Sequence, residues 1–349
     1  MRRIAFAVPG DLATPTGGYA YDRRMIAELA GLGWNIEIID IGDGFPRPNA
    51  ERRAAAQARL AAVPAGRPIV IDGLAFGVLP EAAARLCSRH PLIALVHHPL
   101  ALEFDLSAAQ ADALRASERA ALAAASRVVA TSASTARLLV SDYDVVDDLI
   151  TVARPGSDPA PTARGSSDGI VRLLAVGAVV PRKGFDVLIA ALAMLVDLPW
   201  QLTIAGDRRR DLAAAARLDA DIAYHGLGER IAVLGAVLPE RVTELYVGAD
   251  MFALASRFEG YGMAFAEAIA HGLPVIGTTA GAIPETVPAG AGVLVAPDDS
   301  GALALALRRL IENPDKRRRL AAAACEAARS LPSWQDSAKQ FSRALEAVA

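Results

Sequence analysis

Short apolar runs alternate with stretches of helical periodicity along most of the chain. In the first half the expected strands span 4–8, 35–41, 68–71, 92–96, 128–130 and 149–152, with helices over 19–32, 50–62, 80–89 and 108–125. Runs of this length without polar alternation are typical of strands that are buried on both faces. Their repeated alternation with helices predicts a parallel sheet that is covered by helices and joined by right-handed crossovers.

A break interrupts the alternation at Arg154–Gly169, which reads RPGSDPAPTARGSSDG and has no apolar periodicity. The same pattern then restarts. The second set of expected strands spans 171–176, 201–205, 231–234, 251–255, 274–277 and 292–295, with helices over 185–196, 210–221, 240–247 and 263–270. Two Rossmann-like units in tandem are therefore expected, with the break as the linker between them.

The tail of the chain is helical from 301 to 349, with Pro314 and Pro332 at expected helix starts. In the last helix Trp334, Phe341 and Leu345 form one apolar stripe. We expect an N-terminal domain over 1–165, a C-terminal domain over 166–332, and a final helix over 333–349 that packs back on the N-terminal domain. Two such domains, with parallel sheets that face each other across a cleft, would bind ligands at the carboxyl ends of their strands.

Composition narrows the class of protein. Of 349 residues 53% are hydrophobic and 21% charged, which indicates a well-cored globular protein, and a net charge of -3 argues against a general nucleic-acid binder. No segment reaches the roughly 20 apolar residues that a spanning helix needs, and the opening MRRIAFAVPGDL turns polar too early for a secretory signal. A cytoplasmic protein with at most peripheral membrane contact is expected.

The segment SRFEGYGMAFAEAIAHG (256–272) carries the strongest chemical signal. Glu259 lies in a loop after an expected strand, and Gly260 and Gly262 allow a tight turn into a helix near Met263. Backbone N–H groups at such a helix start bind anions and hydroxyls. Glu267, in the second turn, is suited to a ribose diol because a carboxylate accepts two hydroxyl hydrogen bonds. Either acid taken alone would be read as a solvated residue.

A second signal is VGAVVPRKG (176–184), between the first strand and the first helix of the second unit. Arg182 and Lys183 add two charges where a phosphate would lie over a helix N-terminus. The chain has only three lysines, Lys183, Lys316 and Lys339, so a lysine in this position is informative. A solvated basic pair near a turn is the alternative.

Two weaker signals lie in the first unit. Gly17 and Gly18 precede a helix and would let backbone approach a phosphate, although the G-x-G-x-x-G fingerprint is absent. His97 and His98 end a strand, where an imidazole would bind a sugar hydroxyl or move a proton. Which of the two faces the ligand is left open, because neighbours on a strand point to opposite faces. No metal site is expected, since no Asp or Glu follows them before Glu103.

In order, VGAVVPRKGFDVLIAAL, LTIAGD, FEGYGMAFAEAIAHGLPVIGT and AGAIPE make the chain resemble the retaining GT-B glycosyltransferases of family 4, also called glycosyl transferases group 1. The resemblance covers nearly the whole chain and is strongest from Val171 to Asp298. It implies the following site: Glu259 on the donor sugar; Gly177 and the backbone of Gly260, Tyr261, Gly262 and Met263 on the sugar and diphosphate; Arg182 and Lys183 on the diphosphate; Glu267 on the ribose; Gly17 and Gly18 where the first domain closes; and His98 near the sugar and acceptor.

The resemblance also implies a reaction. A hexosyl group would pass from a UDP- or GDP-linked donor to a small-molecule, saccharide or lipid-linked acceptor by metal-independent front-face displacement, with no cofactor. One position departs from the family, because Ala178 stands where many relatives carry Arg, with Arg182 as a substitute. A phosphorylase or sugar-nucleotide epimerase on the same fold, and a non-catalytic nucleotide-binding protein, are the alternatives. The sequence does not give the oligomeric state.

Overall fold

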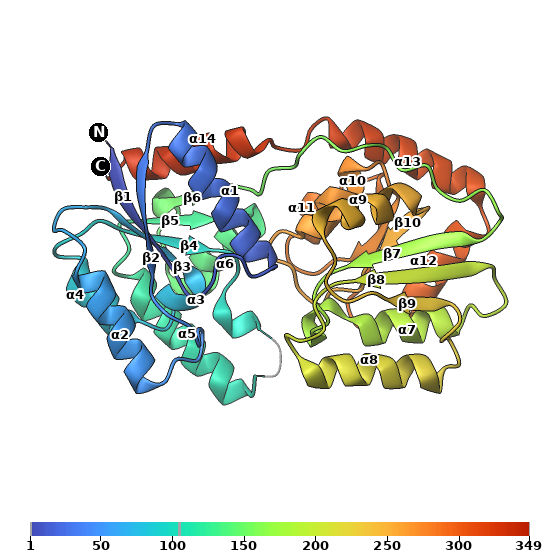
Figure 1. Ribbon diagram of the computed structural model, residues 1–349, viewed down its shortest axis with the longest axis horizontal. Helices are drawn as coiled ribbons and strands as arrows, with labels where there is room; N and C mark the ends of the chain where they lie inside the picture. The colour runs from blue at the N-terminus through green and yellow to red at the C-terminus, as the bar shows by residue number, and fades with distance from the viewer. Residues whose placement is uncertain (1, 104–105, 349) are drawn as a thin grey trace. The chain divides into compact units, whose positions relative to one another are not determined.

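The structure is a computed structural model that describes residues 2–103 and 106–348. The chain forms two compact units, and each is described by itself. Unit 1 comprises Met1–Gly156 together with Pro332–Ala349, and unit 2 comprises Ser157–Leu331. Within the described ranges each unit is built on one six-stranded parallel sheet with helices on both faces (Figure 1).

The sheet of unit 1 has the order β2-β1-β3-β4-β5-β6, and all its pairs are parallel. Its strands are β1 (Arg3–Val8), β2 (Asn35–Asp40), β3 (Ile69–Asp72), β4 (Leu92–Val96), β5 (Arg127–Ala130) and β6 (Ile150–Val152). Its helices are α1 (Gly17–Gly31), α2 (Ala50–Ala61), α3 (Gly73–Phe76), α4 (Pro80–Leu86), α5 (Ala108–Leu122), α6 (Ala133–Tyr143) and α14 (Trp334–Glu346), with short 3-10 turns η1 (Leu100–Leu102) and η2 (Asp147–Leu149).

After β1 the chain adds β2 on one side of this strand and then β3 to β6 on its other side. Right-handed crossovers therefore place α1 on one face and the helices between β2 and β6 on the other. Helix α14 packs against α1 and along β5 and β6, so the end of the chain completes the α1 layer (Figure 1). The core contains the fully buried strands β3 and β4, and it is closed by side chains such as Phe76 and Leu139.

The sheet of unit 2 has the order β12-β11-β10-β7-β8-β9. Its strands are β7 (Val171–Val176), β8 (Trp200–Ala205), β9 (Ile231–Val233), β10 (Met251–Ala253), β11 (Val275–Thr278) and β12 (Gly292–Val295). Its helices are η3 (Pro181–Lys183), α7 (Phe185–Ala193), α8 (Leu212–Tyr224), α9 (Pro239–Gly248), α10 (Met263–Ala270), α11 (Ile283–Thr286), α12 (Ser300–Ile311) and α13 (Pro314–Ala328). Helix α12 packs on α7, and α13 packs on α10.

The predicted α/β class and the two Rossmann-like parallel sheets are confirmed. Helix α6 was missed. Its signals are Ser132, whose hydroxyl accepts from the backbone N–H of Thr135 at 3.0 Å, and an apolar stripe through Ala136, Leu139 and Tyr143. Helix α1 also begins earlier than predicted. Gly17 and Gly18 form its first turn, and Thr16 accepts from the N–H of Tyr19 at 3.2 Å.

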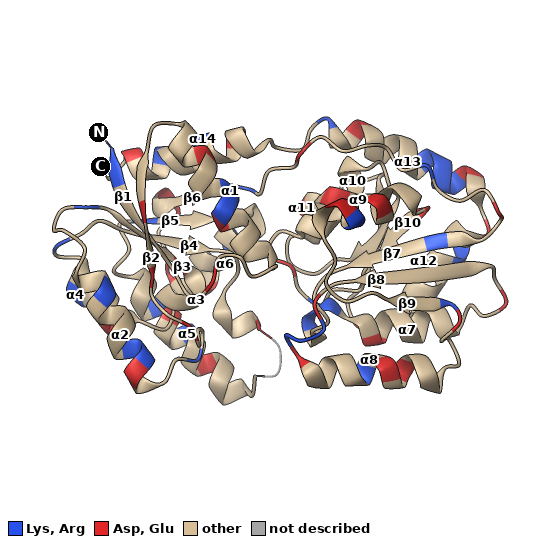
Figure 2. Cartoon of the chain, viewed as in Figure 1, with Lys and Arg blue, Asp and Glu red and all other residues tan. Residues whose placement is uncertain are grey.

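Charge is spread over both units. Figure 2 shows acidic and basic residues interspersed along the helices, as on α2, α8 and α13. Many of them form pairs within a helix, such as Arg115 with Asp112. Among the helices of the described residues, none is long and apolar enough to cross a bilayer.

Candidate active site

The loops that follow β7 and β10 lie next to each other at the carboxyl edge of the unit 2 sheet. Strand β7 pairs with β8 on one side and with β10 on the other, where Leu174 is opposite Phe252. After β7 the chain therefore adds β8 and β9 on one side of this strand and then β10 to β12 on its other side. Open α/β sheets bind ligands outside such a switch point, and here it brings together the two segments that the sequence singled out in this unit.

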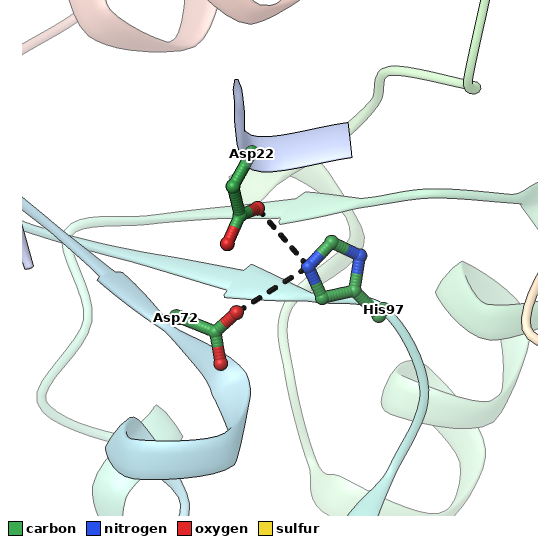
Figure 3. A group of neighbouring side chains, drawn as sticks. All are labelled: Asp22, Asp72 and His97. Carbon is green, nitrogen blue, oxygen red and sulfur yellow. Dashed lines mark hydrogen bonds and ion pairs between the residues drawn. The ribbon is translucent and has the colours of Figure 1, made fainter. Parts of the chain in front are cut away.

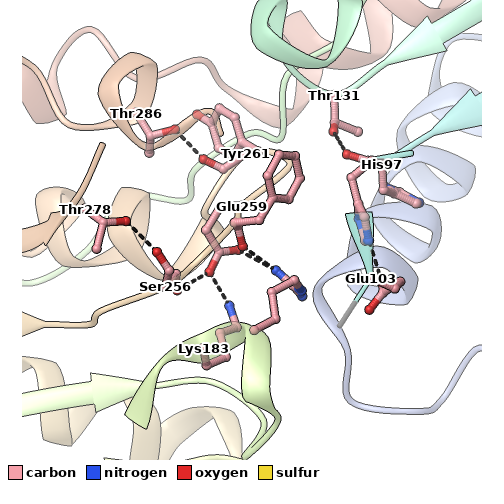
Figure 4. A network of polar contacts seen from close by, with 12 residues as sticks. His97, Glu103, Thr131, Lys183, Ser256, Glu259, Tyr261, Thr278 and Thr286 are labelled. Atoms are coloured by element: carbon pink, nitrogen blue, oxygen red, sulfur yellow. Dashed lines mark hydrogen bonds and ion pairs between the residues drawn. The ribbon is translucent and has the colours of Figure 1, made fainter. Parts of the chain in front are cut away.

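Glu259 is the centre of this site (Figure 4). Lys183 Nζ donates to its Oε1 at 2.6 Å, and the hydroxyl of Ser256 donates to the same oxygen at 2.6 Å. Arg182 Nη1 lies 3.3 Å from Oε2. The three charged side chains are only 7% (Glu259), 13% (Lys183) and 16% (Arg182) exposed. The sequence predicted the charged residues together, but it did not reveal Ser256 as a partner.

The electrostatics of this cluster favour an ionised carboxylate. Burial raises the pKa of Glu259, but the charges of Lys183 and Arg182 outweigh burial and lower that pKa to about 2. Burial lowers the pKa of Lys183, while the charge of Glu259 acts in the opposite direction. With Glu259 charged, the two cations leave the cluster one positive charge in excess, which suits an anionic ligand.

Backbone contacts hold the two loops in register. Arg182 Nη1 donates to the carbonyl of Phe258 at 2.8 Å, and the N–H of Arg257 donates to the carbonyl of Arg182 at 2.8 Å. The guanidinium of Arg257 also binds the carboxylate of Asp186 at 2.7 Å and the carbonyl of Pro181 at 2.6 Å. The positions of Arg182 and Lys183 are therefore fixed by the Glu259 loop.

The close approach of the loops requires glycine. Gly184 has φ +64°, and a Cβ there would lie 2.0 Å from the carbonyl oxygen of Ala255. Gly262, which precedes α10, has φ +91°. Neither α7 nor α10 has a side-chain cap at its N-terminus, so both helices present backbone N–H groups at this edge of the sheet.

The remaining predicted residues of unit 2 lie around the cluster. Gly177 packs against Lys183, because a Cβ at Gly177 would be 3.1 Å from Lys183 Cε. Gly260 and Tyr261 are buried in the β10 loop, and Met263 begins α10. Ala178 follows Gly177 and presents no cation, as the sequence states.

Glu267 lies one turn into α10 and has a partner that the sequence did not reveal. The hydroxyl of Tyr246, from α9, donates to Glu267 Oε2 at 3.0 Å. The Tyr246 ring is stacked on His271 with a centroid distance of 4.8 Å. Burial raises the pKa of Glu267, while the hydrogen bond from Tyr246 lowers it. Tyr246 gives no signal in the sequence because its contact depends on how α9 packs beside α10.

In unit 1 the two predicted histidines turn to different partners at the end of β4. His98 Nε2 lies 2.6 Å from Glu103 Oε1, while His97 Nε2 lies 3.2 Å from Asp22 Oδ1 and 3.4 Å from Asp72 Oδ2 (Figure 3). Gly18 lies against the His97 ring, since a Cβ there would be 3.4 Å from His97 Cδ2. The expectation that carboxylates are remote from the pair holds only along the sequence, because Asp22 and Asp72 reach His97 through the fold.

The comparison with known protein families matches a segment that lies within unit 2. Residues 163–327 match the family described as "Glycosyl transferases group 1". The chain is 32% identical over 251 residues to the D-inositol 3-phosphate glycosyltransferase of Nocardia farcinica, covering 65% of this chain and 56% of that protein. It is 28% identical over 233 residues to the mannosylfructose-phosphate synthase of Agrobacterium fabrum, covering 61% and 51%. The chain thus spans little more than half the length of these curated relatives.

Solved structures show the same fold over the full length. Sucrose-phosphate synthase from Thermosynechococcus elongatus superposes with a TM-score of 0.81 at 22% identity, and 100% of both chains is covered. HepE of Anabaena, solved in complex with UDP-glucose, superposes with a TM-score of 0.74 at 19% identity, and 99% of both chains is covered. The Glu259 loop and the Lys183 loop thus lie inside the segment that matches the glycosyl transferases group 1 family, and the chain has the GT-B fold.

Proposed function

We propose that this chain is a retaining glycosyltransferase that moves a hexosyl group from a UDP- or GDP-linked sugar to an acceptor. The observation that supports this most directly is the buried cluster of Lys183, Arg182 and Glu259 at the β7–β10 switch point. It combines an excess of positive charge with two uncapped helix N-termini, and these are the groups that a diphosphate needs.

The cluster suits a leaving diphosphate better than a bound one. As the bond from the anomeric carbon to the diphosphate breaks, negative charge grows on the phosphate oxygens. Cations that are already fixed in place stabilise this charge in the transition state without having to reorganise. Lys183 would bind as a point charge. Arg182 would bind with its fork of N–H groups and would replace the Arg that many relatives carry at the position of Ala178.

Glu259 and Glu267 would bind the other two parts of the donor, the sugar and the ribose. Glu259, anchored by three donors, would accept hydroxyl hydrogen bonds from the sugar, with Gly177 and the backbone of Gly260, Tyr261, Gly262 and Met263 around it. Glu267, oriented by Tyr246, would hold the ribose. Because the Glu259 carboxylate is buried and engaged, it favours a binding role over that of a covalent nucleophile. Retention would then follow from front-face attack on an oxocarbenium-like centre, without a bound metal.

The acceptor is proposed only as a class. The names of both relatives and of the first structure contain a phosphorylated polyol or sugar. We therefore place phosphorylated small molecules first in an acceptor screen, ahead of saccharides and lipid-linked acceptors. Gly17, Gly18 and His98 remain predicted contacts of unit 1, and a cytoplasmic location remains a prediction.

A ligand screen tests the proposal. A nucleotide diphosphate or its sugar at 100 times its dissociation constant is expected to stabilise the protein by about 2.7 kcal/mol in a thermal-shift assay. The sugar that binds should then be transferred or slowly hydrolysed, and NMR of the product should show the anomeric configuration of the donor. Failure of every UDP- and GDP-linked sugar to bind would refute the proposal, and phosphorolysis without transfer would indicate a phosphorylase instead.

A further inference from the structure

A second cluster of buried charge lies at the carboxyl edge of the unit 1 sheet. His97 follows β4, Asp72 ends the neighbouring strand β3, and Asp22 lies in α1, which follows β1. Both carboxylates are almost fully buried, at 0% exposed for Asp22 and 1% for Asp72, and the His97 side chain is 18% exposed. The proposed function gives these acids no role.

Both acids meet the same atom of His97. Asp22 Oδ1 is 3.2 Å and Asp72 Oδ2 is 3.4 Å from Nε2, and the two contacts approach this nitrogen from either side of the ring edge (Figure 3). Asp72 cannot swing away easily, because its Oδ1 accepts from the N–H of Leu74 at 2.7 Å. A nitrogen that faces two carboxylates must carry its proton. Nε2 is therefore a donor in this arrangement.

The rest of the ring is held as firmly. Gly18 lies against the Cδ2 and Nε2 side, and the Tyr21 ring packs edge-on to the imidazole at a centroid distance of 5.3 Å. The hydroxyl of Thr131 donates to the His97 carbonyl at 3.0 Å (Figure 4). Nδ1, on the opposite edge of the ring, points away from both acids (Figure 3), and 18% of the His97 side chain is exposed.

We propose that Asp22 and Asp72 are positioning residues that form a carboxylate clamp, which holds His97 as a doubly protonated cation and presents its Nδ1–H as a fixed hydrogen-bond donor to an oxygen of the substrate. Two buried carboxylates close together can both stay ionised only with a positive charge beside them, and His97 supplies it. His97 would then stabilise an oxygen or a developing negative charge, and would not act as a general base. The substrate part of this inference depends on the proposed function.

Titration of the cluster is consistent with this geometry. Burial lowers the pKa of His97, but the hydrogen bonds and charges of Asp22 and Asp72 outweigh burial and raise that pKa to about 10. Burial, followed by the charge of Asp72, raises the pKa of Asp22. Burial also raises the pKa of Tyr21, the other titratable group on α1 that faces the ring, so Tyr21 stays neutral. His97 should remain charged at pH values where an ordinary histidine is neutral.

The first experiment does not depend on activity. The ring nitrogens of the five histidines can be followed by NMR against pH in the full-length protein, and His97→Gln assigns the signal of His97. We expect His97 to keep the doubly protonated pattern beyond pH 8. In Asp22→Asn or Asp72→Asn its titration should move down toward the usual histidine range near 6.5. Asp112→Asn, a surface change on α5, should leave it unmoved.

The second experiment asks what the charge does. His97→Gln should lower kcat for transfer by about 100-fold, on the scale of a lost hydrogen-bond donor to a developing negative charge. Asp22→Asn and Asp72→Asn should lower kcat by a smaller factor, leave the thermal shift with UDP or GDP unchanged, and move the alkaline limb of the pH profile to lower pH. A merely structural role for the acids would change stability without moving that limb.

Three outcomes would overturn the clamp. In the first, His97 of the wild-type protein titrates near 6.5, which can be measured even if neither Asp variant folds. In the second, a folded Asp variant leaves the His97 titration in place. In the third, Mn²⁺ or Zn²⁺ binds stoichiometrically and Asp22→Asn abolishes the binding, so that the three side chains are a metal site. If no sugar nucleotide is turned over, the proposed function fails, while the NMR result still decides the clamp.

Discussion

At the scale of single residues, Glu259 is the position where stability and proposed function meet. Its carboxylate is buried, and its charge is held by Lys183, Arg182 and Ser256. Removing one partner of a buried ion cluster leaves the others incompletely paired, so substitutions here should affect folding as well as ligand binding. Lys183 should therefore stabilise the fold as well, although its residue type suggests only a role in ligand binding.

Replacing Lys183 with Ala should reduce donor turnover by at least about 100-fold, because a fixed cation at the leaving group is lost. The same change should cost about 1–3 kcal/mol of unfolding free energy, because Glu259 stays buried with fewer partners. Enzyme assays and urea unfolding measure the two effects. Lys339→Ala removes an exposed lysine that pairs with Asp336 within α14, and it should do neither. Near-normal turnover in Lys183→Ala would remove Lys183 from the site.

The depressed pKa of Glu259 also predicts a pH dependence of stability. The folded value is about 2 and the ordinary value is 4.5, so the folded state binds this proton less tightly than the unfolded chain does. The contribution is therefore complete above pH 4.5 and is lost as pH falls toward 2, by an amount on the order of 3 kcal/mol. Urea unfolding of the wild-type protein and of Glu259→Gln between pH 3 and 7 should show a shallower acid loss in the variant. Parallel curves would show that the cluster does not hold this carboxylate in its charged form.

At the scale of elements, the sequence predicted what local pattern controls. Buried parallel strands such as β3 and β4 carry uninterrupted apolar runs, and Gly262 followed by Met263 indicated the start of α10 correctly. The pairing of distant elements could not be predicted. Tyr246 contacts Glu267 from another helix. Asp22 lies on the buried side of α1 beside Met25, and the pattern of a single helix does not show which residues of other elements its side chain will contact.

The turn into α7 gives a test of how closely two loops must approach. Gly184→Ala combines a left-handed backbone, φ +64°, with a Cβ 2.0 Å from the carbonyl oxygen of Ala255. Gly226→Ala is the matched control, because Gly226 has φ +65° and nothing within 4 Å of the added Cβ. The control should lose about 1–2 kcal/mol of stability from backbone strain. Gly184→Ala should lose more, and it should also weaken nucleotide binding because the Lys183 loop is pushed from the Glu259 loop. Equal losses in urea unfolding would show that the contact adds nothing.

At the scale of the whole molecule, each unit has its own hydrophobic core, and the end of the chain covers the other face of the unit 1 sheet. Helix α14 belongs to unit 1 although unit 2 precedes it in the sequence. Phe341 is fully buried and stacks with Phe6 at 6.4 Å, and the indole N–H of Trp34 donates to the hydroxyl of Ser342 at 2.9 Å. The last helix thus has partners in the first strand and in the turn before β2.

Phe341→Ala should therefore destabilise unit 1 by about 3–5 kcal/mol, the usual cost of removing a large buried aromatic side chain. The three tryptophans allow the units to be followed separately, because Trp34 and Trp334 lie in unit 1 and Trp200 lies in unit 2. With Trp200 as the sole tryptophan, the urea midpoint of unit 2 should change little in Phe341→Ala. With Trp34 retained instead, the midpoint of unit 1 should fall clearly. Phe341→Leu, which keeps most of the apolar volume, should lie between the wild-type protein and Phe341→Ala. If both probes report the same shift, the two cores unfold as one cooperative unit and α14 stabilises the whole chain.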